Sequence, residues 1–135
     1  MKKIIIIGRP YSNGGDYLIY HRLVCAIKKS MPDVEIDVKL GSDEQLNIEE
    51  LNGYDVIVTG GGGAQFSEEH IRTSFLYKHF DEIQVPVHYM GTGLYGADGT
   101  NKTVFGYRYS EEMSAYFKKV VNRGGQIASR DWTVD

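Results

Sequence analysis

The sequence predicts an α/β fold: a three-layer, Rossmann-like, doubly wound parallel sheet of about five strands. Short runs of β-branched residues alternate along the chain with segments whose apolar residues recur at helical spacing, the pattern of repeated strand–helix units. The strongest of these runs are continuously apolar, as in parallel strands that are covered on both faces. The rules for strand connections favour a doubly wound sheet, for which we expect the strand order 3-2-1-4-5.

The first strand is predicted over Ile4–Ile7, four consecutive isoleucines that follow Lys2 and Lys3. This run is too short to be the apolar core of a signal peptide. After a turn rich in glycine, the apolar residues of 16–30 have helical spacing, and Lys28 and Lys29 occupy the last turn. Cys25 falls on the apolar side of this helix, so we expect a packed thiol. The alternating segment 34–38 is typical of an edge or half-exposed strand.

The second half of the chain repeats this pattern. A buried strand is predicted over 54–59, and it ends at the run Gly60–Gly63. Ser67 followed by two glutamates indicates the start of a helix. Pro86 opens a strand that continues to Met90.

The last predicted helix begins after a long loop, which runs from Thr92 to about Tyr109. Ser110 is the expected N-cap, and the helix ends at Gly124 or Gly125. The segment 126–129 is the predicted fifth strand. No internal repeat or linker is present, so we expect a single domain over 1–135.

Composition and charge exclude several classes of protein. The chain of 135 residues is 41% hydrophobic and 24% charged, an ordinary globular balance, and its net charge of −3 argues against a nucleic-acid partner. Its one cysteine and four histidines show no metal-ligand spacing, so we expect no metal site. No run approaches the roughly 18 apolar residues of a membrane span. We therefore expect a cytoplasmic protein without a transmembrane segment.

Glycine is over-represented, with 16 residues in the chain against a usual share of roughly 7%. Eleven of them fall in three loops that each follow a predicted strand: Gly8, Gly14, Gly15; Gly60–Gly63; Gly91, Gly93, Gly96, Gly99. In a parallel sheet these loops meet at the carboxyl ends of the strands, where open α/β folds bind ligands. Tight turns also need glycine, so one such loop is ambiguous. Three converging loops predict a ligand cleft.

The known phosphate-binding fingerprints are absent from these loops. The first loop lacks the G-x-G-x-x-G spacing of dinucleotide-binding proteins, and no G-x-x-x-x-G-K-[ST] segment occurs. The backbone amides of Gly60–Gly63 could nevertheless form an anion-binding concavity.

Four segments together resemble the N-terminal half of the polysaccharide pyruvyl transferase family. They are Asn13-Gly14-Gly15-Asp16, Asp55 to Gly63, Pro86 to Gly93, and Ile127 to Asp131. They match, in order, the N-x-G-D motif of that family, its D-x-x-[IV]-x-G-G-G segment, its strand ending in G-x-G and its strand ending in R-D. Two positions differ: Tyr17 stands where an acidic residue is common, and Arg9-Pro10-Tyr11 replaces a glycine-rich turn.

The resemblance implies a glycosyltransferase-B-like enzyme of two domains that transfers pyruvyl from phosphoenolpyruvate onto a pair of sugar hydroxyls in polysaccharide biosynthesis. This chain would supply one wall of the cleft and bind a saccharide or a nucleotide-sugar-like ligand. A second domain, missing from this sequence, would supply most of the donor site. The co-substrate is phosphoenolpyruvate, and no other cofactor is expected. The isolated chain is expected to fold without catalysing the transfer.

The candidate site residues come from the same four segments. Asp16 is the candidate catalytic residue; alternatively, its carboxylate only stabilises the start of its helix. Arg130 can bind an anionic group through its bidentate fork, or can pair with Asp131. The candidate ligand-binding residues are Asn13, Gly15, Gly61, Gly62, Gly63, Gly91, Gly93 and Arg130. The alternative function is a stand-alone domain that binds a small ligand, a nucleotide or a sugar, without catalysis.

Overall fold

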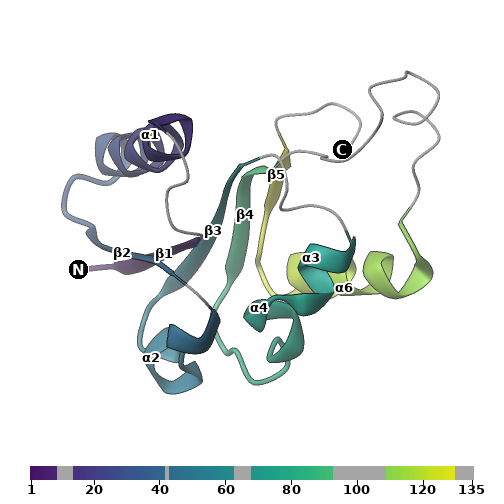
Figure 1. Ribbon diagram of the computed structural model, residues 1–135. Coiled ribbons are helices and arrows are strands. Elements are labelled where there is room, and N and C mark those ends of the chain that lie inside the picture. Colours follow the sequence, from purple (N-terminus) through teal and green to yellow (C-terminus); the bar gives the residue numbers. More distant parts are fainter. Residues whose placement is uncertain (9–13, 42, 63–67, 93–108, 130–135) are drawn as a thin grey trace.

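A computed structural model describes residues 1–8, 14–41, 43–62, 68–92 and 109–129 of the chain, and the rest is drawn in grey in Figure 1. Five parallel strands form one sheet in the order β2-β1-β3-β4-β5. They are β1 (Lys3–Gly8), β2 (Glu35–Leu40), β3 (Val56–Gly62), β4 (Val87–Thr92) and β5 (Ile127–Ser129). The predicted fold class is confirmed.

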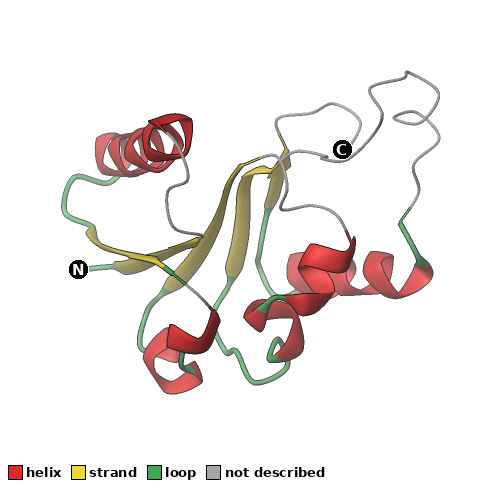
Figure 2. Cartoon of the chain, in the orientation of Figure 1, coloured by secondary structure: helices red, strands yellow, loops and turns green. Residues whose placement is uncertain are grey.

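Helices cover both faces of this sheet (Figures 1 and 2). The helix α1 (Gly14–Ser30) lies on one face. The other face carries α2 (Ile48–Asn52), α3 (Glu68–Thr73), α4 (Phe75–Lys78) and α6 (Glu111–Asn122), with the short 3-10 helix η1 (Asp43–Gln45) before α2. In the part of the chain that the structure describes, no helix is long and apolar enough to cross a membrane.

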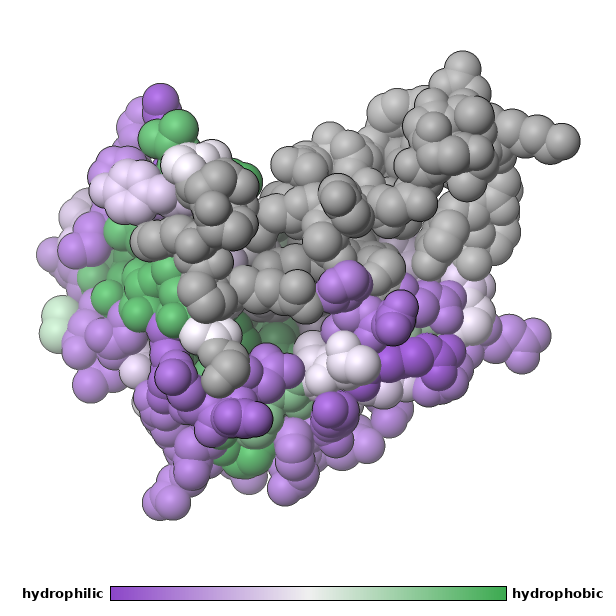
Figure 3. Space-filling model, in the orientation of Figure 1, coloured by the Kyte–Doolittle hydropathy of each residue, from purple (hydrophilic) through white to green (hydrophobic). Residues whose placement is uncertain are grey.

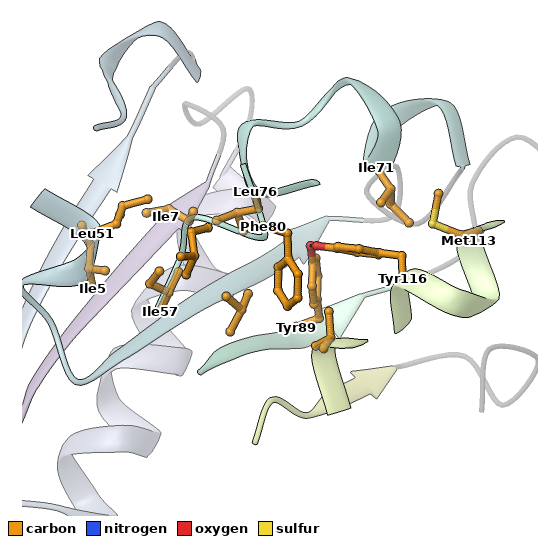
Figure 4. Packing of buried hydrophobic residues seen from close by; sticks show 13 residues of the cluster. Ile5, Ile7, Leu51, Ile57, Ile71, Leu76, Phe80, Tyr89, Met113 and Tyr116 are labelled. Carbon is orange, nitrogen blue, oxygen red and sulfur yellow. The ribbon is translucent and has the colours of Figure 1, made fainter. Parts of the chain in front are cut away.

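The side chains of β1 alternate between two hydrophobic layers. Ile5 and Ile7 point into the larger layer, near Leu51 of α2 and Leu76 of α4, as the close-up in Figure 4 shows. Ile4 and Ile6 point into the smaller layer, where Tyr20 of α1 is buried. All four isoleucines are at most 4% exposed. The continuous apolar run of β1 is therefore explained by burial on both faces.

The expected strand order 3-2-1-4-5 is wrong, because β3 is the central strand of the sheet and β2 lies at an edge. In β3, Ile57 and Val58 are buried on opposite faces, whereas Asp37 and Val38 of β2 are exposed. A strand that leaves both faces partly open is stable at an edge, and a strand that is apolar on both faces is not. The alternation of 34–38 thus correctly indicated an edge strand, but the expected order placed it inside the sheet.

Two further differences concern the helices. Cys25 is exposed on α1, with its Sγ 3.7 Å from Nε2 of His21, so the expected packed thiol is wrong. Tyr20 and its neighbours on the inner side of the helix fill the layer, and Cys25 lies on the outer side.

The short helix α2, which begins after the N-cap Asn47, was not predicted. Figure 3 shows hydrophobic surface near α1 and mainly hydrophilic surface over α2 and α4.

Gly60 is fixed by the packing of β3 against β4. A Cβ atom at this position would lie 1.8 Å from the carbonyl oxygen of Met90, its register partner on β4. Because the obstructing atoms belong to the backbone of the next strand, a side chain cannot be accommodated by a change of rotamer. The first glycine of the run 60–63 is therefore required by the sheet itself.

We predict that Gly60→Ala lowers the free energy of unfolding by about 1–3 kcal/mol, because the two strands must separate to admit the methyl group. Denaturant unfolding of the purified variant measures this loss. Gly14→Ala is the matched control, since a Cβ there meets no atom within 4 Å; we expect it to change stability by less than about 0.5 kcal/mol. Equal stability of the two variants would contradict the close packing of β3 and β4.

Candidate functional site

The carboxyl ends of β3 and β4 bring several predicted site residues together. Gly60 pairs in register with Met90, and Gly62 pairs with Thr92. Gly61 and Gly62 therefore run beside Gly91 on the neighbouring strand. These three predicted ligand-binding positions share one edge of the sheet, as the sequence indicated.

The start of α1 lies at the same edge. The ring of Tyr20 packs against the end of β1 so closely that a Cβ at Gly8 would lie 1.9 Å from the tyrosine hydroxyl. Gly15 and Asp16, in the first turn of α1, are about one turn nearer the N-terminus of the helix than Tyr20. The other predicted positions, Asn13, Gly63, Gly93 and Arg130, and the side chain of Asp16 lie outside the described residues.

The strand order creates a topological switch point between β1 and β3. From β1 the chain continues to β2 on one side, and from β3 it continues to β4 on the other side. Connections that depart in opposite directions leave an opening between adjacent strands, and open α/β sheets bind their ligands there.

A pocket of about 110 Å³ lies at this switch point. Its lining comes from the ends of β1 and β2, from β3 and β4, from the segment before α2, and from α3 and α4: Ile7, Gly8, Lys39, Gly41, Asp43, Leu46, Thr59, His70, Ile71, Thr73, Ser74, Phe75, Leu76 and Tyr89. Ile7, Ile71, Leu76 and Tyr89 belong to the larger hydrophobic layer. The pocket thus has an apolar floor and a polar rim, as ligand sites commonly do.

Most polar groups of the rim are held by hydrogen bonds within the protein. Lys39 Nζ donates to Glu50 Oε2 over 2.6 Å, and Asp43 Oδ2 accepts the backbone N–H of Phe75 over 2.8 Å. The hydroxyl of Ser74 donates to the carbonyl of Ile71 over 2.6 Å. These contacts fix the rim in place, so the pocket is a preformed feature of the fold.

One wall of the pocket is anchored by a pair of buried tyrosines. The hydroxyl oxygens of Tyr89 on β4 and Tyr116 on α6 lie 2.6 Å apart. Burial raises the pKa of Tyr89 to about 12, and burial also raises the pKa of Tyr116. Both hydroxyls therefore stay protonated at neutral pH, and their hydrogen bond ties the strand that lines the pocket to α6.

A charged cluster joins the start of α3 to the start of α6. Glu68 Oε1 accepts the backbone N–H of Ser110 over 2.5 Å, and Arg72 donates to Ser110 Oγ and Glu68 Oε2, each over 3.2 Å. Arg72 also donates to Glu112 over 2.7 Å, and the Tyr77 hydroxyl donates to the same carboxylate. The helix α3 follows the run Gly60–Gly63, and α6 follows the predicted loop that contains Gly93, Gly96 and Gly99. The cluster therefore ties together the two helices that come after these glycine loops.

Lys39, Thr59 and His70 were not predicted as site residues. His70 was weighed only as a metal ligand, and among the described residues no group of three potential ligands could hold a metal ion. A signal was available for Thr59: it follows Ile57 by two residues and therefore faces the same layer, at the end of a buried strand. The correct strand order is needed to see that Ile7 and Thr59 are neighbours.

Comparisons of the chain with models of protein families, with curated proteins and with solved structures find no match. The resemblance of the four segments to pyruvyl transferases therefore stays a prediction.

We predict that the charged cluster makes stability depend on pH. The backbone N–H of Ser110 lowers the pKa of Glu68, and the hydroxyl of Tyr77, followed by Arg72, lowers the pKa of Glu112. A carboxyl whose pKa is lower in the folded state stabilises the fold above its unfolded pKa, and this contribution is lost as the pH falls through the folded value. The melting temperature should therefore decrease as the pH falls below the usual carboxyl pKa of 4.5.

Melting curves between neutral and acid pH measure this effect. Glu112→Gln should melt at a lower temperature at neutral pH and should lose less on acidification than the native chain. Glu111→Gln, an exposed neighbour on α6, is the matched control and should follow the native profile. Identical acid profiles for Glu112→Gln and the native chain would contradict the role of the cluster.

Proposed function

We propose that this chain forms the acceptor wall of a pyruvyl-type transferase and binds a saccharide or a nucleotide-sugar-like ligand at the carboxyl edge of its sheet. One observation carries the proposal. Three of the resembling segments include β3, β4 and β5, and the fourth follows β1 and enters α1. These four strands are consecutive neighbours in the sheet, and β2 lies outside them. This order supports the proposal that the four segments contribute to one site.

The proposed reaction assigns a task to each kind of residue at this edge. One sugar hydroxyl adds across the double bond of phosphoenolpyruvate, so that its oxygen bonds to the central carbon and a proton goes to the methylene carbon. The second hydroxyl oxygen then bonds to the same carbon as the C–O bond to phosphate breaks, and the proton of that hydroxyl leaves through a base or with the phosphate. Asp16 would take a hydroxyl proton as a general base. The glycines allow the backbone to approach the ligand closely, and Arg130 would bind an anionic group bidentately. A second domain would supply the facing wall and most of the donor site.

The pocket favours a second function, binding of a small ligand without catalysis. It is built entirely from this chain and has its own floor and rim, so it needs no facing domain to be complete. In both functions the ligand binds at the carboxyl edge of the sheet. In the first it then accepts a pyruvyl group, and in the second it is bound without reacting.

We predict that Asp16→Asn weakens binding of the acceptor and leaves the melting temperature nearly unchanged, because the change removes a negative charge from the ligand edge and keeps the shape of the side chain. Isothermal titration with sugar acceptors and thermal unfolding measure the two effects. Asp33→Asn, exposed after the far end of α1, is the matched control. A lower melting temperature with unaltered binding would instead identify Asp16 as a residue that only stabilises the helix start.

We predict that the 135-residue chain alone releases no measurable phosphate from phosphoenolpyruvate in the presence of sugar acceptors. Positioning of both reactants across a cleft can contribute about 7–11 kcal/mol to lowering a barrier, and this chain supplies one wall only. The assay compares this chain with any longer product of the same gene, which should turn over. Robust turnover by the 135-residue chain would contradict the proposed division of the site, and an inactive longer product would contradict the transferase.

A further inference from the structure

We infer that the pocket at the switch point is a subsite for an uncharged, hydroxyl-bearing group, with the Thr59 hydroxyl as its hydrogen-bond partner, and that it excludes phosphate and carboxylate groups. This inference deepens the proposed function, and it rests on that function in identifying the bound molecule as the acceptor.

Thr59 is the observation that points to a ligand. Tyrosines aside, it is the one buried polar residue in the described part of the chain, with 9% of its surface exposed. It lines the pocket, and within the described residues no hydrogen bond from its hydroxyl is found. Among the described residues, the Thr59 hydroxyl is not one of the fully buried side-chain polar atoms that lack a partner, so it opens onto the pocket. A hydroxyl in this position is available to pair with a ligand.

The charges around the pocket select the class of that ligand. One ammonium group, that of Lys39, faces the rim, and it is already bound to the carboxylate of Glu50. The carboxylate of Asp43 also lines the rim. His70 lines the pocket as well. Because Glu50 offsets the charge of Lys39, the carboxylate of Asp43 is left without a cation among these three groups, and an anion brought beside it is disfavoured. A hydroxyl group, by contrast, can donate to Asp43 and accept from Thr59.

The floor of the pocket suits the carbon skeleton of such a ligand. Ile7, Leu76 and Tyr89 are each at most 6% exposed and present an apolar surface beneath the polar rim. An apolar floor with a few convergent polar groups is the usual construction of a site for a small neutral molecule. An entering ring can therefore place C–H groups on the floor and hydroxyl groups on the rim.

The test measures the affinity of the 135-residue chain for methyl glucoside, methyl galactoside and methyl mannoside as uncharged probes, and for inorganic phosphate and pyruvate as anionic probes. At least one glycoside should bind, and the anions should not compete with it. Thr59→Val should lower the glycoside affinity by about tenfold, the value of one lost hydrogen bond. The same variant should melt at nearly the same temperature, because valine keeps the shape of the side chain and suits a strand position. Thr59→Ser, which keeps the hydroxyl, should retain the affinity.

The outcomes separate this inference from the proposed function. Glycoside binding that Thr59→Val leaves unchanged overturns the subsite and leaves the acceptor wall standing. The subsite is also overturned if phosphate or pyruvate competes with the glycoside for the native chain and this competition is lost in Thr59→Val. Glycoside binding that depends on Thr59, combined with an inactive longer product, supports the subsite and overturns the transferase. A chain that binds none of the glycosides overturns both proposals.

Discussion

Burial of β1 and β3 on both faces is the constraint on which the rest of the structure depends. Ile5, Ile6 and Ile57 are at most 1% exposed, and fully burying one such side chain contributes roughly 1.5–3 kcal/mol. Neither strand can therefore lie at an edge, and the half-exposed β2 takes that place. With β1 and β3 adjacent, the chain must leave them in opposite directions, because their partners β2 and β4 lie on opposite sides. The switch point is thus a consequence of hydrophobic burial.

The chemistry of the site follows from the same arrangement. Glycine at position 60 lets β3 and β4 run close together, so Gly61, Gly62 and Gly91 leave the sheet at neighbouring points. On the side of α3 and α4, the ends of the strands leave a preformed pocket whose rim is fixed by internal hydrogen bonds. The glycine-lined edge and the pocket are next to each other.

The sequence predicted the fold class well because strand burial is a local property that four isoleucines in a row display directly. It also predicted that Gly61, Gly62 and Gly91 share an edge, since any parallel sheet brings strand ends together. To predict the strand order, two segments had to be compared with each other. Apolar and polar residues alternate over 34–38, whereas 56–58 is continuously apolar, and this difference decides which strand lies at the edge of the sheet. The pocket could not be predicted, because the residues that line it together with Thr59 come from β1, β2 and α4, and the strand order brings them together. The charged cluster of Glu68 and Arg72 joins residues about 40 positions apart, which no local pattern reveals.

The central claim is that a ligand binds at the carboxyl edge of the sheet, at the switch point between β1 and β3. Mapping of backbone amide chemical shifts during a titration of the chain with a methyl glycoside tests it most directly. The account predicts that the largest changes fall at Gly8, at Thr59–Gly62 and at Gly91. Changes confined to the opposite edge, at Glu35, Val56 and Val87, would contradict it.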